Sequence, residues 1–552
     1  MYNTPNCPVL FGQSGLLVGP FLSKAGDRMS KYLLVKGKIW TGSRSAPWAE
    51  AAVVRHGHFV YVGGFKEARE NFRAAEVEDW GGNLVMPGMS DAHLHLTAFA
   101  RQGIYVDLLS VKSLDEVAQR LRAKASEVSE GAWIRAINYN EMAWPDTSPP
   151  TKEWLDSLGL GNPVVLSRYC GHRHVANSIA MRVSGLENSS DPYVLRGADG
   201  KTTGVMTEGG ASPIIDMVAA QYETPQKLVD AMERATLYMA SQGVTCGHAC
   251  DAPKYALGEE LFTWQELYER GKLPVRVICY HDRLPDFTFR SGMGNKQIMY
   301  GGLKIFMDGT LGGHTCYMRA PFDDMPETCG VPNHTDDELT ETLRAAHRRG
   351  IQVQAHMIGD AAIEQCADAV ARVIAEEGQP RLPYRFVHVI VCPEDLRAKL
   401  KKLGVVLDVQ PCQCYTDRVM APLRLGAERT KDAYPFRALW DTGLLVTGST
   451  DAPMELENMW IGIWNAVCRC DDDGSPLKYD MSQTLTLDEA LTAYTVNPWI
   501  AVGKGDEYGR IAEGYAADFT VVDGNPFERP MMELRNTTHL ATYLGGRKVW
   551  HA

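Results

Sequence analysis

The stretch LVMPGMSDAHLH at residues 84–95 joins an apolar, strand-like run to two histidines at its end. Later stretches repeat this arrangement, in which an apolar run carries a residue able to bind a metal or exchange a proton: GLKIFMDG (302–309), IQVQAH (351–356), RFVH (385–388) and LLVTGSTD (444–451). In a parallel barrel the carboxyl ends of all strands meet at one face, where catalytic groups gather. We therefore expect these residues to converge in space, although they are far apart in the chain.

Segments with helical periodicity alternate with these runs. After Thr335, Asp336 or Asp337 can cap a helix through LRAAHRR, Gly350 can end it, and the strand IQVQAH follows. Such alternation is typical of parallel βαβ units, so the sequence predicts an α/β fold.

The two ends of the chain differ from the middle. Residues 32–42 and 51–63 near the N-terminus, and 517–527 and 540–550 near the C-terminus, are short strand-like runs punctuated by glycine. The first 28 residues contain prolines and glycines but no basic region before an apolar run, which argues against a signal peptide.

Composition narrows the functional class. The chain has 552 residues, is 45% hydrophobic and 22% charged, and has a formal net charge of −12 without basic runs. This balance argues against nucleic acid and anionic membrane surfaces as partners. No apolar stretch approaches the ~18 residues of a membrane span. We expect a cytoplasmic protein that acts on a small-molecule substrate and can form a homo-oligomer.

The residue types at the ends of the runs point to metal chemistry. His93 and His95 stand at i and i+2, on one side of an extended strand, and neutral imidazoles suit a borderline cation such as zinc. Lys304 lies within an apolar run, where a lysine is costly unless it is paired or modified. Each residue alone has an ordinary structural explanation in a core or a turn. Taken together, these residues favour a metal-binding site over separate structural roles.

The sequence resembles a known group in a series of stretches that occur in a fixed order: MPGMSDAHLHL (86–96), GHRHVANS (171–178), GVMTEG (204–209), GLKIFMDGTLG (302–312), QAHMIGDAAI (354–363), RFVHV (385–389), TGSTDAP (447–453) and GYAADFTVVDGNPF (514–527). This resemblance, from about residue 32 to 552, is to the amidohydrolase superfamily. Within it, the chain is most similar to the YtcJ-like branch that includes N-substituted formamide deformylases (amidohydrolase family 3).

The resemblance implies a (β/α)8 TIM-type barrel with a small β-sandwich domain formed by both chain termini. The implied organisation is an N-terminal extension (1–31), a β-sandwich (32–85 plus 505–552) and a metal-dependent barrel (86–504). An insertion around residues 130–215 is expected to cover the barrel mouth, since the chain between His93 and Lys304 is longer than two strands require.

The resemblance also implies roles for single residues. His93, His95 and Asp451 would bind one metal and His356 and His388 a second, with Lys304 carbamylated to bridge two Zn²⁺ ions. A metal-activated hydroxide would then cleave a C–N bond, with Asp451 as proton shuttle. By the same comparison, His172, Asn177 and Glu208 would contact substrate.

Two alternatives remain open at this point. Mononuclear deaminases of the superfamily usually carry a glutamate three residues after the histidine that corresponds to His356, whereas this chain has Gly359 there. That difference and Lys304 favour the hydrolysis of an amide-like, non-peptide C–N bond. A non-catalytic regulatory protein of the same fold is the other alternative, and such relatives typically lack some of the ligands that are present here.

Overall fold

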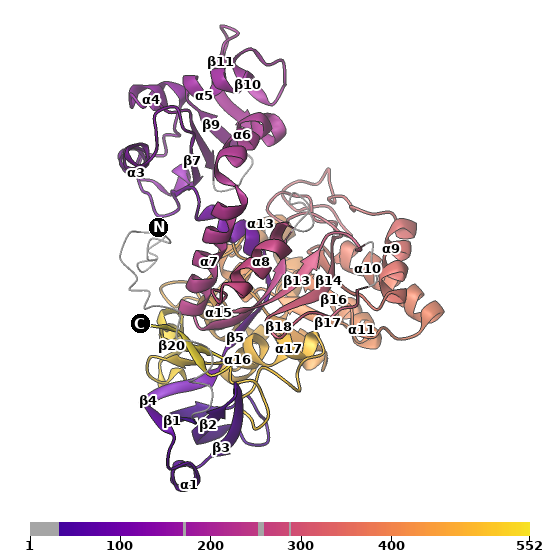
Figure 1. Cartoon of the computed structure of the whole chain (residues 1–552). Coiled ribbons are helices and arrows are strands. Elements are labelled where there is room, and N and C mark those ends of the chain that lie inside the picture. The colour runs from indigo at the N-terminus through magenta and orange to yellow at the C-terminus, as the bar shows by residue number, and fades with distance from the viewer. Residues whose placement is uncertain (1–31, 169–172, 252–258, 286–288) are drawn as a thin grey trace. The chain divides into compact units, whose positions relative to one another are not determined.

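The computed structural model of the protein describes residues 32–168, 173–251, 259–285 and 289–552 (Figure 1). These residues form two compact units, one of residues 98–235 and one of residues 32–97 together with 236–552. The predicted extension, residues 1–31, lies outside the described residues. Among the helices that are described, none is long and apolar enough to cross a membrane.

The larger unit contains an eight-stranded parallel sheet. Around the sheet the strands follow the order β5 (Met89–Leu94), β12 (Val244–Cys250), β13 (Arg276–His281), β14 (Ile298–Phe306), β15 (Gln352–Met357), β16 (Arg385–His388), β17 (Val406–Val409) and β18 (Leu445–Gly448). The Asp451 N–H donates to the carbonyl of His93 at 2.8 Å. The His95 N–H donates to the carbonyl of Ala452 at 2.8 Å. These bonds join the end of β5 to the segment after β18, and the predicted barrel fold is confirmed.

Helices follow most of the barrel strands, because parallel strands need crossover connections, which are usually helical. They are α8 (Glu259–Glu269), α9 (Asp336–Arg348), α10 (Asp360–Glu377), α11 (Glu394–Leu403), α12 (Pro411–Thr416), α13 (Met420–Arg429), α14 (Phe436–Asp441), α15 (Met459–Cys468), α16 (Leu487–Thr495) and α17 (Asn497–Ala501). Helix α9 begins with a capping box between Thr335 and Glu338. Asp336 and Asp337 lie inside its first turn, so the expectation that one of them is the N-cap is wrong. The N-cap is Thr335, one residue earlier, whose hydroxyl accepts the hydrogen bond from the Glu338 N–H.

The two ends of the chain share a seven-stranded mixed sheet. Its order is β21 (Arg547–His551), β20 (His539–Leu544), β19 (Phe519–Val522), β4 (Glu76–Pro87), β1 (Leu33–Trp40), β2 (Trp48–Arg55) and β3 (His58–Gly63). Strand β4 pairs with β1 in parallel and with β19 antiparallel, so it joins the N-terminal and C-terminal strands. In Figure 1 these are the indigo and yellow strands. The rings of Phe519 and Tyr543 stack 4.2 Å apart in its core. This sheet is consistent with the predicted small β-sandwich domain, which both ends of the chain form together.

The smaller unit has a sheet of its own. Its strands lie in the order β10 (Val194–Arg196), β11 (Thr202–Thr207), β9 (Arg173–Ala176), β8 (Val164–Arg168), β7 (Ile134–Tyr139) and β6 (Val106–Asp107). The helices α3 (Leu114–Glu127), α4 (Lys152–Ser157), α5 (Ser178–Val183) and α6 (Ser212–Tyr222) belong to the same unit. The predicted insertion, 130–215, falls among these residues, and its role over the barrel mouth stays a prediction.

Candidate metal centre

The six residues expected to bind metal lie at the carboxyl ends of barrel strands. They are His93 in β5, His95 directly after it, Lys304 in β14, His356 in β15, His388 in β16 and Asp451 after β18. All except the partly exposed His95 are buried. The barrel thus brings together side chains that are far apart in the sequence.

His93, His95 and Asp451 form one close group. Oδ1 of Asp451 lies 3.3 Å from Nε2 of His93 and 3.4 Å from Nε2 of His95. His93, His388 and Asp451 each offer one candidate ligand atom, and these three atoms lie within 4.8 Å of one another. Zinc bonds of about 2 Å in a tetrahedral site place the donor atoms about 3.3 Å apart. The spacing of this group therefore fits a divalent cation.

The remaining side chains lie beside that group. The ring centroids of His356 and His388 are 4.5 Å apart, and those of His93 and His388 are 5.6 Å apart. Nζ of Lys304 lies 3.2 Å from Nε2 of His93. Four imidazoles, one amine and one carboxylate therefore share a single buried cluster.

Burial controls the charge of this cluster. It lowers the pKa of His93 and of His388 well below the ordinary value, which favours the neutral, metal-binding form. Burial also lowers the pKa of Lys304 to about 8. For Asp451, burial raises the pKa, but the nearby imidazole rings of His93 and His95 outweigh it and hold the pKa well below the usual range. The cluster thus combines the neutral imidazoles of His93 and His388 with an ionised carboxylate.

A polar atom in this cluster lacks a partner. Among the described residues, none donates a hydrogen bond to the buried Oδ1 of Asp451. Burying a carboxylate oxygen without a partner is costly, and a cation bound there would remove that cost. Imidazole and carboxylate are ligands that zinc prefers. The residues present therefore fit a divalent metal.

The backbone at two of these residues is strained. Asp451 has a φ of 63° and His388 a φ of 73°, in the left-handed region that favours glycine. Asp91 stabilises the backbone next to these residues, because its Oδ1 accepts hydrogen bonds from the N–H groups of Thr450 (3.0 Å) and His93 (3.3 Å). Asp91 was not assigned a role from the sequence, although it stands two residues before His93 in the motif that defines the first strand.

Gln410 was also missed. Its Oε1 accepts a hydrogen bond from Nδ1 of His388 at 2.7 Å, while its Nε2 donates to Oγ of Ser449 at 2.8 Å. A proton on Nδ1 leaves Nε2 of His388 free as a metal ligand. The only sequence signal is a glutamine directly after the β17 run, which has no specific meaning until the neighbouring strand is known.

Asp308 organises the loop beside His356. Its carboxylate accepts the N–H groups of Tyr317 at 3.0 Å and Gly359 at 2.9 Å, and its Oδ1 lies 3.4 Å from Nε2 of His356. A Cβ atom at Gly359 would lie 2.0 Å from the carbonyl oxygen of Tyr317. This loop therefore leaves no room for the glutamate that deaminases usually carry at that position.

The residues expected to contact substrate belong to the smaller unit. His172 lies outside the described residues. Asn177 caps α5 by accepting the Ala180 N–H at 2.9 Å, and its side-chain amide also bonds Val164 and Asn162. Glu208 is exposed at the start of a short 3₁₀ helix. Asn177 thus has a structural task, and substrate contact by these residues stays a prediction.

Comparison with known proteins agrees with this arrangement. The sequence profile described as the amidohydrolase family matches residues 76–550. The amidohydrolase-like protein YtcJ of Bacillus subtilis (strain 168) is 29% identical over 527 residues, which cover 93% of this chain and 98% of the relative. An N-substituted formamide deformylase of Arthrobacter pascens is 26% identical over 552 residues, covering 94% of this chain and 98% of the relative. The crystal structure of an uncharacterized metal-dependent hydrolase from Pyrococcus horikoshii OT3 superposes with a TM-score of 0.75 at 26% identity. It covers 91% of this chain and 99% of its own.

Proposed function

The chain belongs to the amidohydrolase family, and on that premise we propose that it cleaves a non-peptide C–N bond in an amide-like small molecule. It is a metal-dependent hydrolase. The observation that carries the proposal is the single buried cluster of four histidines, Lys304 and Asp451 at the carboxyl ends of the barrel strands.

Two sets of ligands support two cations, and we propose zinc. His93, His95 and Asp451 would hold the first cation, while His356 and His388 would hold the second. Bound there, divalent cations would acidify a water molecule and polarise the substrate carbonyl. Five protein donors exceed the four of a tetrahedral site, which supports two cations over one.

Lys304 would link the two sets as a carbamate. Its neutral amine forms an N–C bond to carbon dioxide and releases one proton, which leaves an anionic group with two oxygen donors. A pKa lowered by burial to about 8 makes the neutral amine available near neutral pH. An unmodified ammonium at this position would repel both cations, because like charges are costly in a buried site.

Asp451 would move the proton. Its ionised carboxylate can accept a proton from the attacking water and pass it to the leaving nitrogen as the C–N bond breaks. The hydrogen bond that Nε2 of Gln413 donates to Oδ2 of Asp451 (3.5 Å) and the strained backbone would keep the carboxylate oriented. The products are an acid and an amine.

Metal analysis combined with a substrate screen tests the proposal. Purified protein should contain close to two zinc ions per chain. It should hydrolyse at least one member of a panel of N-formyl, N-acyl, hydantoin-like and cyclic amides, lose that activity to a chelator and regain it with Zn²⁺. About one ion per chain, retained in His388→Ala, would favour the mononuclear alternative. A metal-replete protein that is inert across the panel would contradict the proposal.

A further inference from the structure

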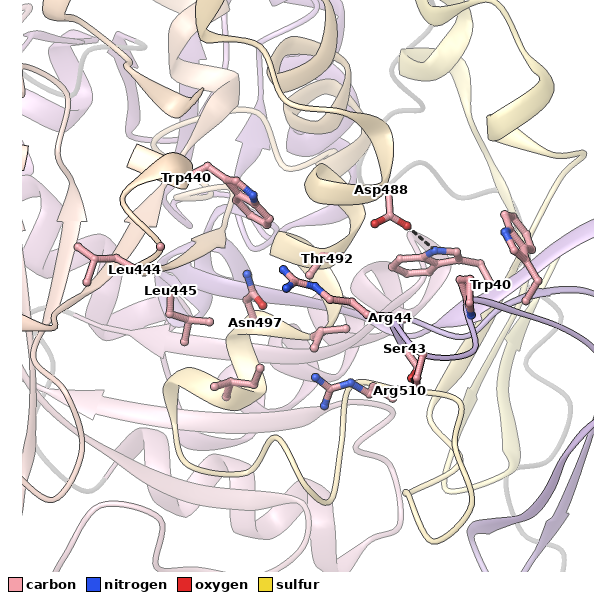
Figure 2. Close-up of a pocket in the computed structure, with 17 residues that line it drawn as sticks. Trp40, Ser43, Arg44, Trp440, Leu444, Leu445, Asp488, Thr492, Asn497 and Arg510 are labelled. Atoms are coloured by element: carbon pink, nitrogen blue, oxygen red, sulfur yellow. Dashed lines mark hydrogen bonds between the residues drawn. The ribbon is translucent and has the colours of Figure 1, made fainter. Parts of the chain in front are cut away.

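A hollow of about 990 Å³ lies at the junction of the terminal sheet and the barrel, within the larger unit (Figure 2). Its lining comes from the β1–β2 connection with the adjoining strand ends, from residues 440–445 up to the first residue of β18, and from α16, α17 and Arg510. Sites for small molecules typically enclose about 300–1,000 Å³. The hollow is therefore large enough for a ligand.

The hollow is separate from the metal centre. Leu445 lines it and is the first residue of β18, whereas Asp451 follows the other end of that strand. At about 3.3 Å per residue, the four-residue strand β18 alone spans roughly 10 Å. A ligand in the hollow would lie at the amino end of β18 and would not touch the reacting groups.

The two arginines that line the hollow, Arg44 and Arg510, form no ion pair with any described carboxylate. Arg44 is exposed and makes no ion pair or hydrogen bond with any described residue. Arg510 donates to the Gly505 carbonyl at 2.8 Å but pairs with no carboxylate of the described chain. Asp488, the one acidic residue of the lining, accepts a hydrogen bond from Nε1 of Trp40 at 2.9 Å (Figure 2). The lining therefore has more positive than negative charge, although the chain as a whole is acidic.

Large apolar side chains accompany these arginines. Trp48 is 48% exposed and Ile500 39% exposed, while Trp440 is partly buried. The Trp48 ring meets Phe527 edge-on, with centroids 5.0 Å apart, which fixes the indole while much of its surface stays open. In Figure 2 the Arg44 side chain extends towards Thr492 and Asn497. A lining that contains both indoles and guanidinium groups suits a ligand that is both flat and negatively charged.

We propose that this hollow is a second ligand site, which binds an organic anion with a flat apolar body. Arg44 and Arg510 bind the anionic group, and Trp48 and Trp440 contact the body. The charge of the lining selects anions over neutral or cationic compounds of the same shape. This site goes beyond the proposed hydrolysis, which does not require it.

Calorimetric titration of the full, metal-containing protein tests the site with naphthalene-2-sulfonate, because a sulfonate is a poor ligand for the metal centre. We expect saturable binding of one molecule per chain. The double variant R44Q/R510Q should bind about tenfold more weakly or worse, as expected for lost charge-assisted hydrogen bonds. The uncharged analogue 2-(methylsulfonyl)naphthalene should bind weakly to both proteins.

One control variant and two further variants show whether the binding is specific to the hollow. Arg122→Gln removes an exposed arginine of α3 and should leave binding unchanged, whereas Trp48→Ala should weaken it. The single variant Arg44→Gln replaces the double variant if the latter does not fold, since Arg44 makes no hydrogen bond with any described residue. Absence of saturable binding, equal binding of the neutral analogue, or unchanged binding in the arginine variants would overturn the proposal.

Discussion

Nε2 of His93 and Nζ of Lys304 lie 3.2 Å apart, although 211 positions separate the two residues in the chain. Burial lowers the pKa of both side chains, so the pair is stable when neither carries a positive charge. Two neutral nitrogens at this distance do not repel each other, which is compatible with the proposed metal site.

Lys304→Ala should lose the second metal and most of the activity, because the bridging group is gone. Acetate or propionate should restore part of the activity, since a short carboxylate can occupy the space of the lost carbamate. Zinc content and turnover are measured with and without the acid, with chloride at the same ionic strength and the exposed-lysine variant Lys431→Ala as controls. Unchanged metal content and turnover in Lys304→Ala would show that Lys304 has only a structural role.

Asp451→Asn should reduce kcat far more than it changes KM. An amide cannot accept the proton of the attacking water, and general acid–base groups contribute roughly 10²–10⁴-fold in rate. KM should stay within about tenfold, because the lost interaction forms mainly in the transition state. Steady-state kinetics and metal content are measured on the same sample. Wild-type turnover with metal bound would exclude Asp451 as the proton shuttle.

Gln410→Leu should weaken metal binding about 10–100-fold, as is typical when a group that orients a ligating histidine is lost. The Nδ1 proton of His388 would have no acceptor, so the ring would not be fixed in its present orientation. Gln410→Glu keeps an acceptor oxygen and should bind metal more tightly than the Leu variant. Competition with a zinc chelator measures the affinities, and Gln365→Leu in α10 is a matched control. Equal affinities for the Leu variant and the wild type would contradict this role.

Gly359→Ala should lower the free energy of unfolding by about 1–3 kcal/mol, the usual cost of forcing extra atoms into a packed site. The added Cβ would lie 2.0 Å from the carbonyl oxygen of Tyr317. Gly312→Ala is the control, because a Cβ there meets its nearest neighbour, Met420, at 3.6 Å. Urea unfolding compares the midpoints, and an equal shift in both variants would show that the Gly359 loop adapts freely.

His539→Gln should make the protein less sensitive to acid. Burial lowers the pKa of His539 to about 3 in the folded state, below the ordinary 6.5. The stabilisation by neutral His539 is thus complete above pH 6.5 and is lost as the pH falls towards 3, at up to about 1.4 kcal/mol per pH unit. Between pH 6.5 and 5 the wild type should lose about 2 kcal/mol more than the variant. Urea midpoints at both pH values test this, with His551→Gln as control, and parallel pH profiles would contradict it.

The barrel and its cluster could be predicted because five of the eight barrel strands carry a candidate ligand at or near their carboxyl ends. What the sequence could not show are the contacts between strands. Gln410 and Asp91 act on His388 and Thr450, and only the register of neighbouring strands reveals those pairs. The hollow was missed for the same reason, since its lining comes from four segments with no common motif.

The pairing of β4 with β19 also has a consequence during protein synthesis. About 430 residues separate these strands, so at ~5–20 residues per second β4 waits about 20–90 s for its partner to leave the ribosome. During that time one edge of β4 presents unpaired N–H and C=O groups, which readily recruit strands from other chains. Chains that end before Phe519 would keep this edge open permanently. Such truncated products are therefore expected to aggregate or to be degraded, even when every barrel strand has been made.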